Sequence, residues 1–261
     1  MNKDSFTVYN SIDQMVRHLD TIKGGGDSNG TFSPDWYGSA SYDEAKERIL
    51  KGDDDLSKKL KGTERLDIQM PLTGVKKRMV TRVAGFAPHV PNFICGVPNN
   101  MLWVEEQKVA KKVITVVYGC NTRCEASVSE IAKVSARVVS AIMSLERKGY
   151  RVQLYASNVA ENGKMCGFVV KLKDAGQHID VLKLAFPLLS ASWNRRFGFR
   201  YREMCGWYDM GSSLKGYALR NYLNEKKFKY DIALSYYDAK EIKTVEDLEK
   251  LFVDNAKKIN K

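Results

Sequence analysis

The segment 112–156 constrains the fold of this chain more than any other stretch of its sequence. It opens with the apolar run VITVVY at 113–118, which is typical of a strand covered on both faces and which stops at Gly119. Ser127 and Glu130 then form a capping box, apolar residues recur at helical spacing as far as position 145, and Gly149 suits the end of that helix. The alternating RVQLY at 151–155 predicts a second strand. The segment therefore predicts a right-handed βαβ unit whose first loop lies at the carboxyl edge of a sheet.

The rest of the chain alternates in the same way. Strand-like runs at 166–172 and 179–186 are joined by a turn at 174–176, and a helix at 213–223, a last strand at 230–235 and a closing helix at 244–259 follow. Toward the N-terminus, capping boxes at Ser11 and Ser41 open two helices, and a third is expected at 55–61. We expect a helical N-terminal extension at 1–65, with a Gly-rich linker at 24–30, and an α/β core domain at 66–261. The expected core is a mainly parallel sheet with helices on both faces.

The segment 66–103 interrupts this alternation. It holds four of the six prolines together with Gly74, Gly85 and Gly96. This composition predicts an irregular loop system around one or two short strands at 78–83. Loops of this length inside a domain are usually functional or specially packed. His89 and Cys95 lack the regular spacing of metal ligands, so we expect a structural histidine.

Charge is the clearest compositional feature of the chain. The 261 residues are 44% hydrophobic and carry a formal charge of +11 with a pI near 9.3. Such an excess favours anionic partners, chiefly nucleic acid, although it also serves solubility. No apolar run approaches the roughly 20 residues of a membrane span, and no signal-peptide pattern opens the sequence. With five cysteines, an odd number, the composition predicts a cytoplasmic protein with reduced thiols and no membrane partner.

Arginines alternate with aromatic residues between positions 193 and 203. Guanidinium groups bind phosphates and aromatic rings stack on bases, so Arg195, Arg196, Arg200 and Arg202 are the best candidates for nucleic-acid contact. Lys76, Lys77 and Arg78 form a second basic cluster, in a region without acidic residues. Packing is the alternative for the longer segment: aromatics would anchor it, and its arginines would pair with Glu203 and Asp209.

The loop after the first strand of the βαβ unit reads GCNTRC. Its backbone amides and the side chains of Asn121, Thr122 and Arg123 lie at a helix start, which suits an anion or a small ligand. Cys120 and Cys124 could act as nucleophiles, but no nearby histidine and no second cysteine pair support them, and small buried thiols are the competing interpretation. We expect neither a metal nor a cofactor.

Several motifs resemble an uncharacterised family encoded by tailed bacteriophages. These are WxGSxSYxEA at 36–45, AGxxxxVPxxxxGxPxNM at 84–101, and the strand, small-residue helix and GYRV succession that ends at 152. The resemblance implies a phage protein made in the bacterial cytoplasm and brings no activity with it. The βαβ unit also resembles a von Willebrand factor A domain, whose first loop usually carries Asp-x-Ser-x-Ser around a divalent metal. That aspartate is missing here, which predicts a degenerate site without metal.

These features favour a non-enzymatic, phage-encoded binding protein whose basic surface engages nucleic acid. The alternative is a protein-interaction module, in the virion or directed at a host factor, that uses the sheet edge or the loops of 71–103. An enzyme ranks third, because no complete nucleophile, acid/base or metal set can be assembled from the sequence. The sequence leaves the oligomeric state open.

Overall fold

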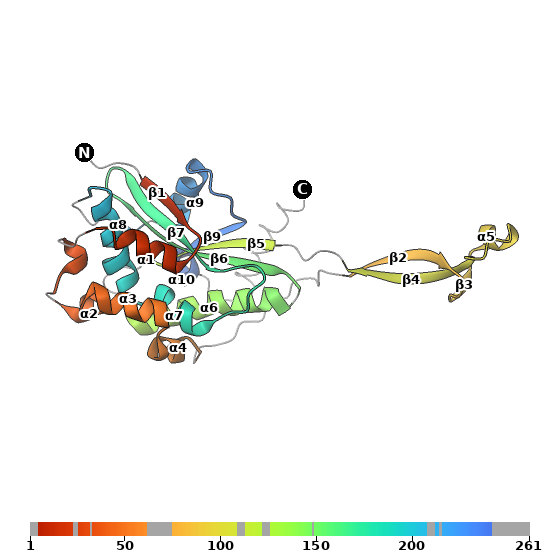
Figure 1. Cartoon of the computed structure of the whole chain (residues 1–261), viewed down its shortest axis with the longest axis horizontal. Helices are drawn as coiled ribbons and strands as arrows, with labels where there is room; N and C mark the ends of the chain where they lie inside the picture. The colour runs from red at the N-terminus through yellow and green to blue at the C-terminus, as the bar shows by residue number, and fades with distance from the viewer. Residues whose placement is uncertain are drawn as a thin grey trace.

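The computed structural model describes residues 5–22, 26–31, 33–61, 75–108, 113–121, 126–147, 149–207, 212–213 and 216–241. Within these ranges the chain forms a body built on a six-stranded mixed sheet, and a long β-arm that projects away from the body (Figure 1). The two parts differ in packing, since the hydrophobic core lies entirely in the body.

The sheet of the body runs in the order β1-β7-β6-β5-β9, and the short strand β8 pairs with β6. β1 is parallel to β7, and β5 is parallel to both β6 and β9, whereas β6 and β7 are antiparallel. The strands are β1 (Ser5–Tyr9), β5 (Val113–Gly119), β6 (Arg151–Glu161), β7 (Met165–Lys173), β8 (Ser212–Ser213) and β9 (Ile232–Ser235). The predicted α/β class with a mostly parallel sheet is therefore confirmed.

The βαβ unit predicted at 112–156 is present as β5, α6 (Val128–Arg147) and β6. The Ser127 hydroxyl accepts the backbone N–H of Glu130 at 3.2 Å, so the expected cap opens the helix. Val116 and Tyr118 of β5 pack in the larger of two hydrophobic clusters, together with the apolar face of α6. Val117, which points the other way, packs in the smaller cluster with Leu219 and Leu223.

The N-terminal segment is part of the body, which differs from the extension predicted at 1–65. β1 pairs along its whole length with β7, from Ser5 opposite Cys166 to Tyr9 opposite Val170. Helices of this segment also contribute Met15 and Ile49 to the main core. They are α1 (Ile12–Leu19), the 3-10 turn η1 (Asp27–Asn29), α2 (Pro34–Tyr37), α3 (Tyr42–Lys51) and α4 (Asp54–Lys61).

The strand predicted at 179–186 is wrong, because this segment is the helix α7 (Val181–Leu189). The Asp180 carboxylate accepts the backbone N–H groups of Leu182 and Lys183 and so caps the helix. The π-helical turn η2 (Trp193–Gly198) leads directly into α8 (Phe199–Met204), and α9 (Gly216–Glu225) and α10 (Tyr236–Glu241) follow. The helix predicted at 244–259 lies outside the described residues. None of the described helices is long and apolar enough to cross a membrane.

The β-arm comprises residues 75–108, and most of it lies in the segment 66–103, where the sequence predicted an irregular loop system around one or two short strands at 78–83. β2 (Val75–Arg82) pairs antiparallel with β4 (Met101–Lys108) over eight positions, and β3 (Ala87–Pro88) adds two residues on the other side of β4. At the far end α5 (Val90–Ile94) forms one helical turn, which is capped by the ring of His89 accepting the Asn92 N–H at 3.4 Å. His89 therefore has the structural role that its spacing predicted.

Candidate interaction surface

The arginine-rich segment folds as η2 and α8 and packs inside the body. Arg195, Arg196, Arg200 and Arg202 are all buried, and Arg196 has no exposed surface. The reason is local: a helical segment with an apolar side chain at nearly every other position cannot expose both its arginines and its rings. Trp193, Phe197 and Tyr201 are fully buried in the main cluster, so the arginines between them are carried into the interior.

Arg196 shows what these guanidinium groups do. It stacks on the ring of Tyr37, with 3.9 Å between the guanidinium carbon and the ring centroid. Its donors reach backbone carbonyls at 2.8 to 3.0 Å and one hydroxyl at 3.3 Å, and the acceptors are the oxygens of Ser28, Gly30, Ser39 and Ala40 and the Oγ of Ser39. Burial lowers the pKa of Arg196 from its ordinary value. Arg196 thus ties the segment between η1 and α3 to η2.

The other three arginines have related partners. Arg200 stacks on Tyr42 at 3.9 Å and donates to the carbonyl oxygens of Leu19 at 3.0 Å and Ile22 at 2.7 Å. Arg195 stacks on Trp36 and donates to its carbonyl oxygen. Arg202 donates to the side-chain oxygen of Asn194 at 2.8 Å, and desolvation lowers its pKa to about 10.

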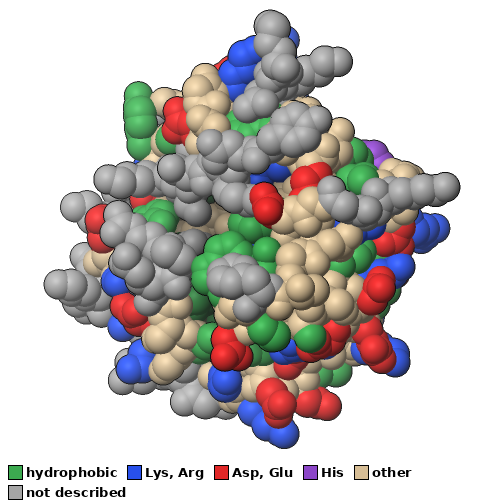
Figure 2. All heavy atoms as spheres, turned by 90° about the vertical axis from the view of Figure 1, so that its left-hand side faces the viewer, with side chains coloured by type: hydrophobic (Ala, Val, Ile, Leu, Met, Phe, Trp, Pro, Cys, Tyr) green, Lys and Arg blue, Asp and Glu red, His purple; other side chains and the backbone are tan. Residues whose placement is uncertain are grey.

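The four arginines therefore do not form the solvent-facing nucleic-acid surface that the sequence predicted. Their guanidinium groups donate hydrogen bonds inside the body, as expected if the segment serves packing. The acceptors, however, are mainly backbone carbonyl oxygens and not the expected carboxylates. Glu203, the expected partner, instead accepts the backbone N–H and hydroxyl of Ser28 at 2.7 and 2.6 Å. On the side of the body turned away from the arm, basic and acidic side chains are interspersed among the described residues (Figure 2).

The remaining predicted residues belong to the arm and to the loop after β5. Lys76, Lys77 and Arg78 belong to β2 in the arm, where Lys77 and Arg78 are exposed and the side chain of Lys76 is not described. Thr122 and Arg123 lie outside the described residues. Asn121 is buried and donates to the carbonyl oxygen of Val159 at 2.9 Å. The predicted basic residues that the structure describes therefore lie in two separate places, η2 with α8 and β2, and do not form one site (Figure 1).

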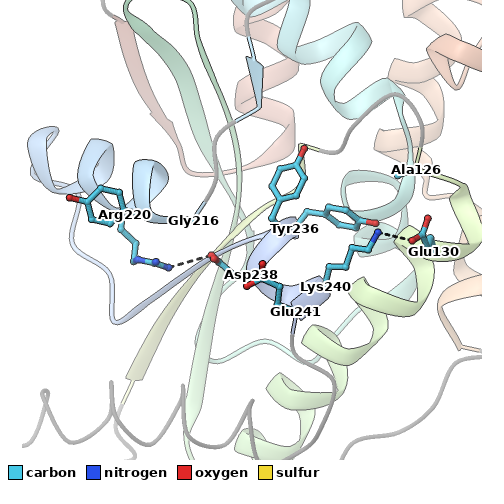
Figure 3. Close-up of a pocket in the computed structure, with 10 residues that line it drawn as sticks. Ala126, Glu130, Gly216, Arg220, Tyr236, Asp238, Lys240 and Glu241 are labelled. Atoms are coloured by element: carbon cyan, nitrogen blue, oxygen red, sulfur yellow. Dashed lines mark hydrogen bonds and ion pairs between the residues drawn. The ribbon is translucent and has the colours of Figure 1, made fainter.

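A cavity of about 610 Å³ lies at the carboxyl end of β9, between α9, α10 and the start of α6. Four of the five charged side chains that line it are paired, since Arg220 contacts Asp238 at 3.3 Å and Lys240 contacts Glu130 at 2.8 Å, and the fifth is Glu241 (Figure 3). Burial raises the pKa of Tyr236, with a further contribution from Glu130. Paired charges leave little net attraction for a charged ligand, and no cluster of three His, Cys, Asp or Glu side chains in the described ranges could hold a metal ion.

The surface that stands out is the arm. None of residues 77–105 is buried, so the ribbon has no core of its own. Large apolar side chains along it are 38% to 77% exposed, and they are Met79, Val83, Phe86, Val90, Phe93, Ile94, Val97, Trp103 and Val104. An apolar surface concentrated in this way is typical of a binding site.

Charge and apolar surface are separated along the arm. Residues 83–104 contain no Asp, Glu, Lys or Arg, in a chain that is 28% charged. All of the arm's Asp, Glu, Lys and Arg residues lie nearer the body, where Arg82 pairs with Glu105 at 2.6 Å. We define residues 83–104 as the arm tip. The sequence placed a protein contact in the loops of 71–103 only as an alternative, and this long uncharged stretch is the signal that would have favoured it.

Both faces of the ribbon are available for contact. Opposite residues of an antiparallel pair share a face, so Met79 and Val104 lie on one face and Val80 and Trp103 on the other. Met79, Val104 and Trp103 are exposed. A partner can therefore contact the arm on either face as well as at its tip.

These features define the chain as an α/β protein that carries a projecting, apolar-tipped β-arm. A family described as "Domain of unknown function (DUF7192)" matches residues 2–255, and the chain belongs to that family. Comparison with curated proteins gave no match, and comparison with solved structures gave none.

Proposed function

We propose that the protein is a protein-interaction module whose arm tip docks on an uncharged, apolar surface of a protein partner. The carrying observation is that the arm exposes large apolar side chains on an uncharged segment with no buried residue. A ribbon of two or three strands without a core is marginally stable in water, and burial against a partner supplies what it lacks. This function was the alternative at the level of sequence, and the buried arginines now make it the better supported one.

A protein suits the arm better than a lipid bilayer does. In the described arm β2 pairs only with β4, so the outer backbone groups of β2 remain without a strand partner. Such groups are costly in hydrocarbon, where neither water nor protein satisfies them. A protein surface can offer apolar contacts to the tip and hydrogen-bonding groups to the ribbon at the same time.

Photo-cross-linking from the arm tip tests this function. The full chain is produced in its native cells with benzoylphenylalanine at position 93 in place of Phe93, and the matched control carries it in place of Met143, an exposed apolar residue of α6. We expect one defined protein adduct from position 93 and none from position 143. The purified adduct partner should then bind the wild-type chain stoichiometrically and the Phe93→Ser/Ile94→Ser variant at least tenfold more weakly. Adducts with lipid or nucleic acid, or equal labelling from both positions, would refute the proposal.

Nucleic-acid binding is the second candidate function, favoured by the formal charge of +11 and by the exposed Arg78 of β2. Contact with phosphates would make affinity fall steeply as salt rises. Fluorescence anisotropy with labelled DNA and RNA, from low to physiological salt, separates the two functions. Retained binding at physiological salt that is weakened by Arg78→Ala, with Arg17→Ala on the exposed face of α1 as control, would favour nucleic acid.

We further propose that the chain is phage-encoded and that its body is a von Willebrand factor A-like domain with a degenerate metal site. The motifs at 36–45 and 84–101 support the first point, and the order of β5, α6 and β6 supports the second. A phage origin would place any partner other than the chain itself in the virion or in the host. Appearance of the protein only in infected cells tests the origin, and an experimental structure tests the fold.

A further inference from the structure

We infer that the arm tip of one molecule packs against the arm tip of a second copy of the same chain. This inference rests on the proposed function and names its partner. It rests on three observations. The described part of the body has no apolar surface that could receive the tip, and a second tip carries no charge that the contact would leave unpaired. The exposed area of the arm is also close to that of one side of a stable interface.

The described part of the body lacks a surface that could receive the tip. Its exposed large apolar residues are scattered over β1, β5, α6 and α9, and they are Val8, Val113, Val128, Met143 and Tyr217. Two cavities in the described part of the body, of about 610 and 500 Å³, are rimmed by charges, the first by Arg220 and Asp238 among others and the second by Glu146 and Arg147. An uncharged tip placed against either rim would desolvate charged groups, including the Arg220–Asp238 pair, and would bring no charge of its own in return.

A second arm tip avoids this cost. Neither tip carries an Asp, Glu, Lys or Arg side chain, so contact between tips desolvates no such charge. If the two arms run in opposite directions, the positively charged end of each arm nearer its body, with Lys77 and Arg78, lies beyond the tip of the other arm. A two-fold arrangement of this kind uses the same patch on both molecules, as most homodimers do.

The exposed area is sufficient for such an interface. The nine large apolar side chains of the arm are between 38% and 77% exposed. Taken at about 150 Å² of full area per side chain, the lower end of the range for aromatic rings, the nine present roughly 780 Å² over both faces and the tip together, close to the about 800 Å² that each partner contributes to an interface of standard size. Two arms can therefore supply an interface without help from the bodies.

The edges of the ribbon indicate which surfaces meet. β2 carries Lys77, Arg78 and Arg82, and a second β2 paired edge to edge would bring these like charges close together. The other edge is formed by β3, which covers only Met101 and Leu102 and includes Pro88, and beyond it by β4, which carries Glu105. Since both edges are protected against strand addition, we assign the contact to the apolar faces and the tip.

Sedimentation velocity of the purified full chain tests the inference. We expect a concentration-dependent dimer in the micromolar range for the wild type and for Met143→Ser, and at least a hundredfold weaker dimer for Phe93→Ser/Ile94→Ser. The substitutions in the arm leave folding of the body unchanged, because no residue of 77–105 is buried there. Unchanged far-UV circular dichroism checks this point.

The native Cys95 provides a second readout on the wild-type chain. It is exposed and follows Ile94 at the tip, so a bismaleimide should link two copies there, and Cys95→Ser should abolish the linked dimer. A wild-type chain that stays monomeric at all concentrations, or a dimer that the Phe93→Ser/Ile94→Ser change does not weaken, would overturn the inference. If position 93 then still cross-links to a different protein, the proposed function stands; if it cross-links to no protein, both fail.

Discussion

Replacement of Arg196 by methionine separates a structural arginine from a phosphate-binding one. The side chain is fully buried, and methionine has a similar length without the five donors. Two of the carbonyl oxygens that it serves, those of Ser28 and Ser39, belong to buried contacts, whereas the contacts to Gly30 and Ala40 reach partly exposed positions.

The expected cost follows from these partners. Each buried acceptor that loses its donor costs about 1–3 kcal/mol, and the lost stacking on Tyr37 adds roughly 0.5–2 kcal/mol. Removal of the desolvated charge offsets part of this sum. We therefore expect Arg196→Met to lower the free energy of unfolding by about 3–4 kcal/mol, a large share of the roughly 5–15 kcal/mol that stabilises a typical domain.

Urea unfolding followed by tryptophan fluorescence measures this difference. Arg17→Met is the matched control, since Arg17 is exposed on α1 and its loss should change stability by less than about 0.5 kcal/mol. The unfolding slope must stay constant for the comparison to hold. A loss below about 1 kcal/mol for Arg196→Met, together with weakened nucleic-acid binding, would refute the structural assignment of this arginine.

Three further predictions concern the arm, the Cys205 thiol and the packing of Gly198. Deletion of 77–105 with a short Gly-Ser replacement should shift the melting temperature of the body by less than about 2 °C, because none of these residues is buried, and a larger fall in calorimetry would contradict the separation of arm and body. Chiefly through a hydrogen bond from Cys166, the pKa of Cys205 is lowered to about 6, so its alkylation should reach half its maximal rate near that pH. The wild type should therefore gain free energy of unfolding relative to Cys205→Ser. This gain should be complete above about pH 8.5, the pKa of a thiol in the unfolded chain, and should disappear as pH falls through 6. A difference that does not change with pH would exclude a lowered Cys205 pKa. Gly198→Ala should lower stability by about 2–4 kcal/mol in urea unfolding, because the new Cβ would lie 2.4 Å from the buried Asn158 amide, and a neutral result would contradict the packing of η2.

The sequence predicted correctly those helices and strands whose ends and apolar spacing are set by neighbouring residues. The βαβ unit is the clearest case, because the Ser127 cap and the helical spacing of apolar residues point to the same structure. The strand predicted at 179–186 is wrong, because a nearly continuous run of apolar residues shows neither the spacing of a helix nor that of a strand. The decisive feature there was the Asp180 cap, followed by helix.

Long-range pairings were beyond this kind of inference. β1 finds its partner β7 about 160 positions away, and nothing within its five residues specifies that partner. The Arg196 side chain likewise meets Ser39 at a separation of 157 positions. Alternating arginines and aromatics predict close contact of the two residue types, but the sequence does not tell whether the guanidinium groups face solvent or carbonyl oxygens.

The composition of the arm was also beyond this kind of inference, because it is explained by contacts with another molecule and not by contacts within the chain. Lys77 and Arg78 on β2 and Pro88 on β3 protect the edges of the ribbon, while the large apolar residues from Met79 to Val104 keep its faces and tip apolar. Exposed apolar groups of this size contribute nothing to folding of the body, which is closed without them. Their stabilising contribution can arise only when another surface removes them from water, so the composition of the arm tip is explained by binding and not by folding.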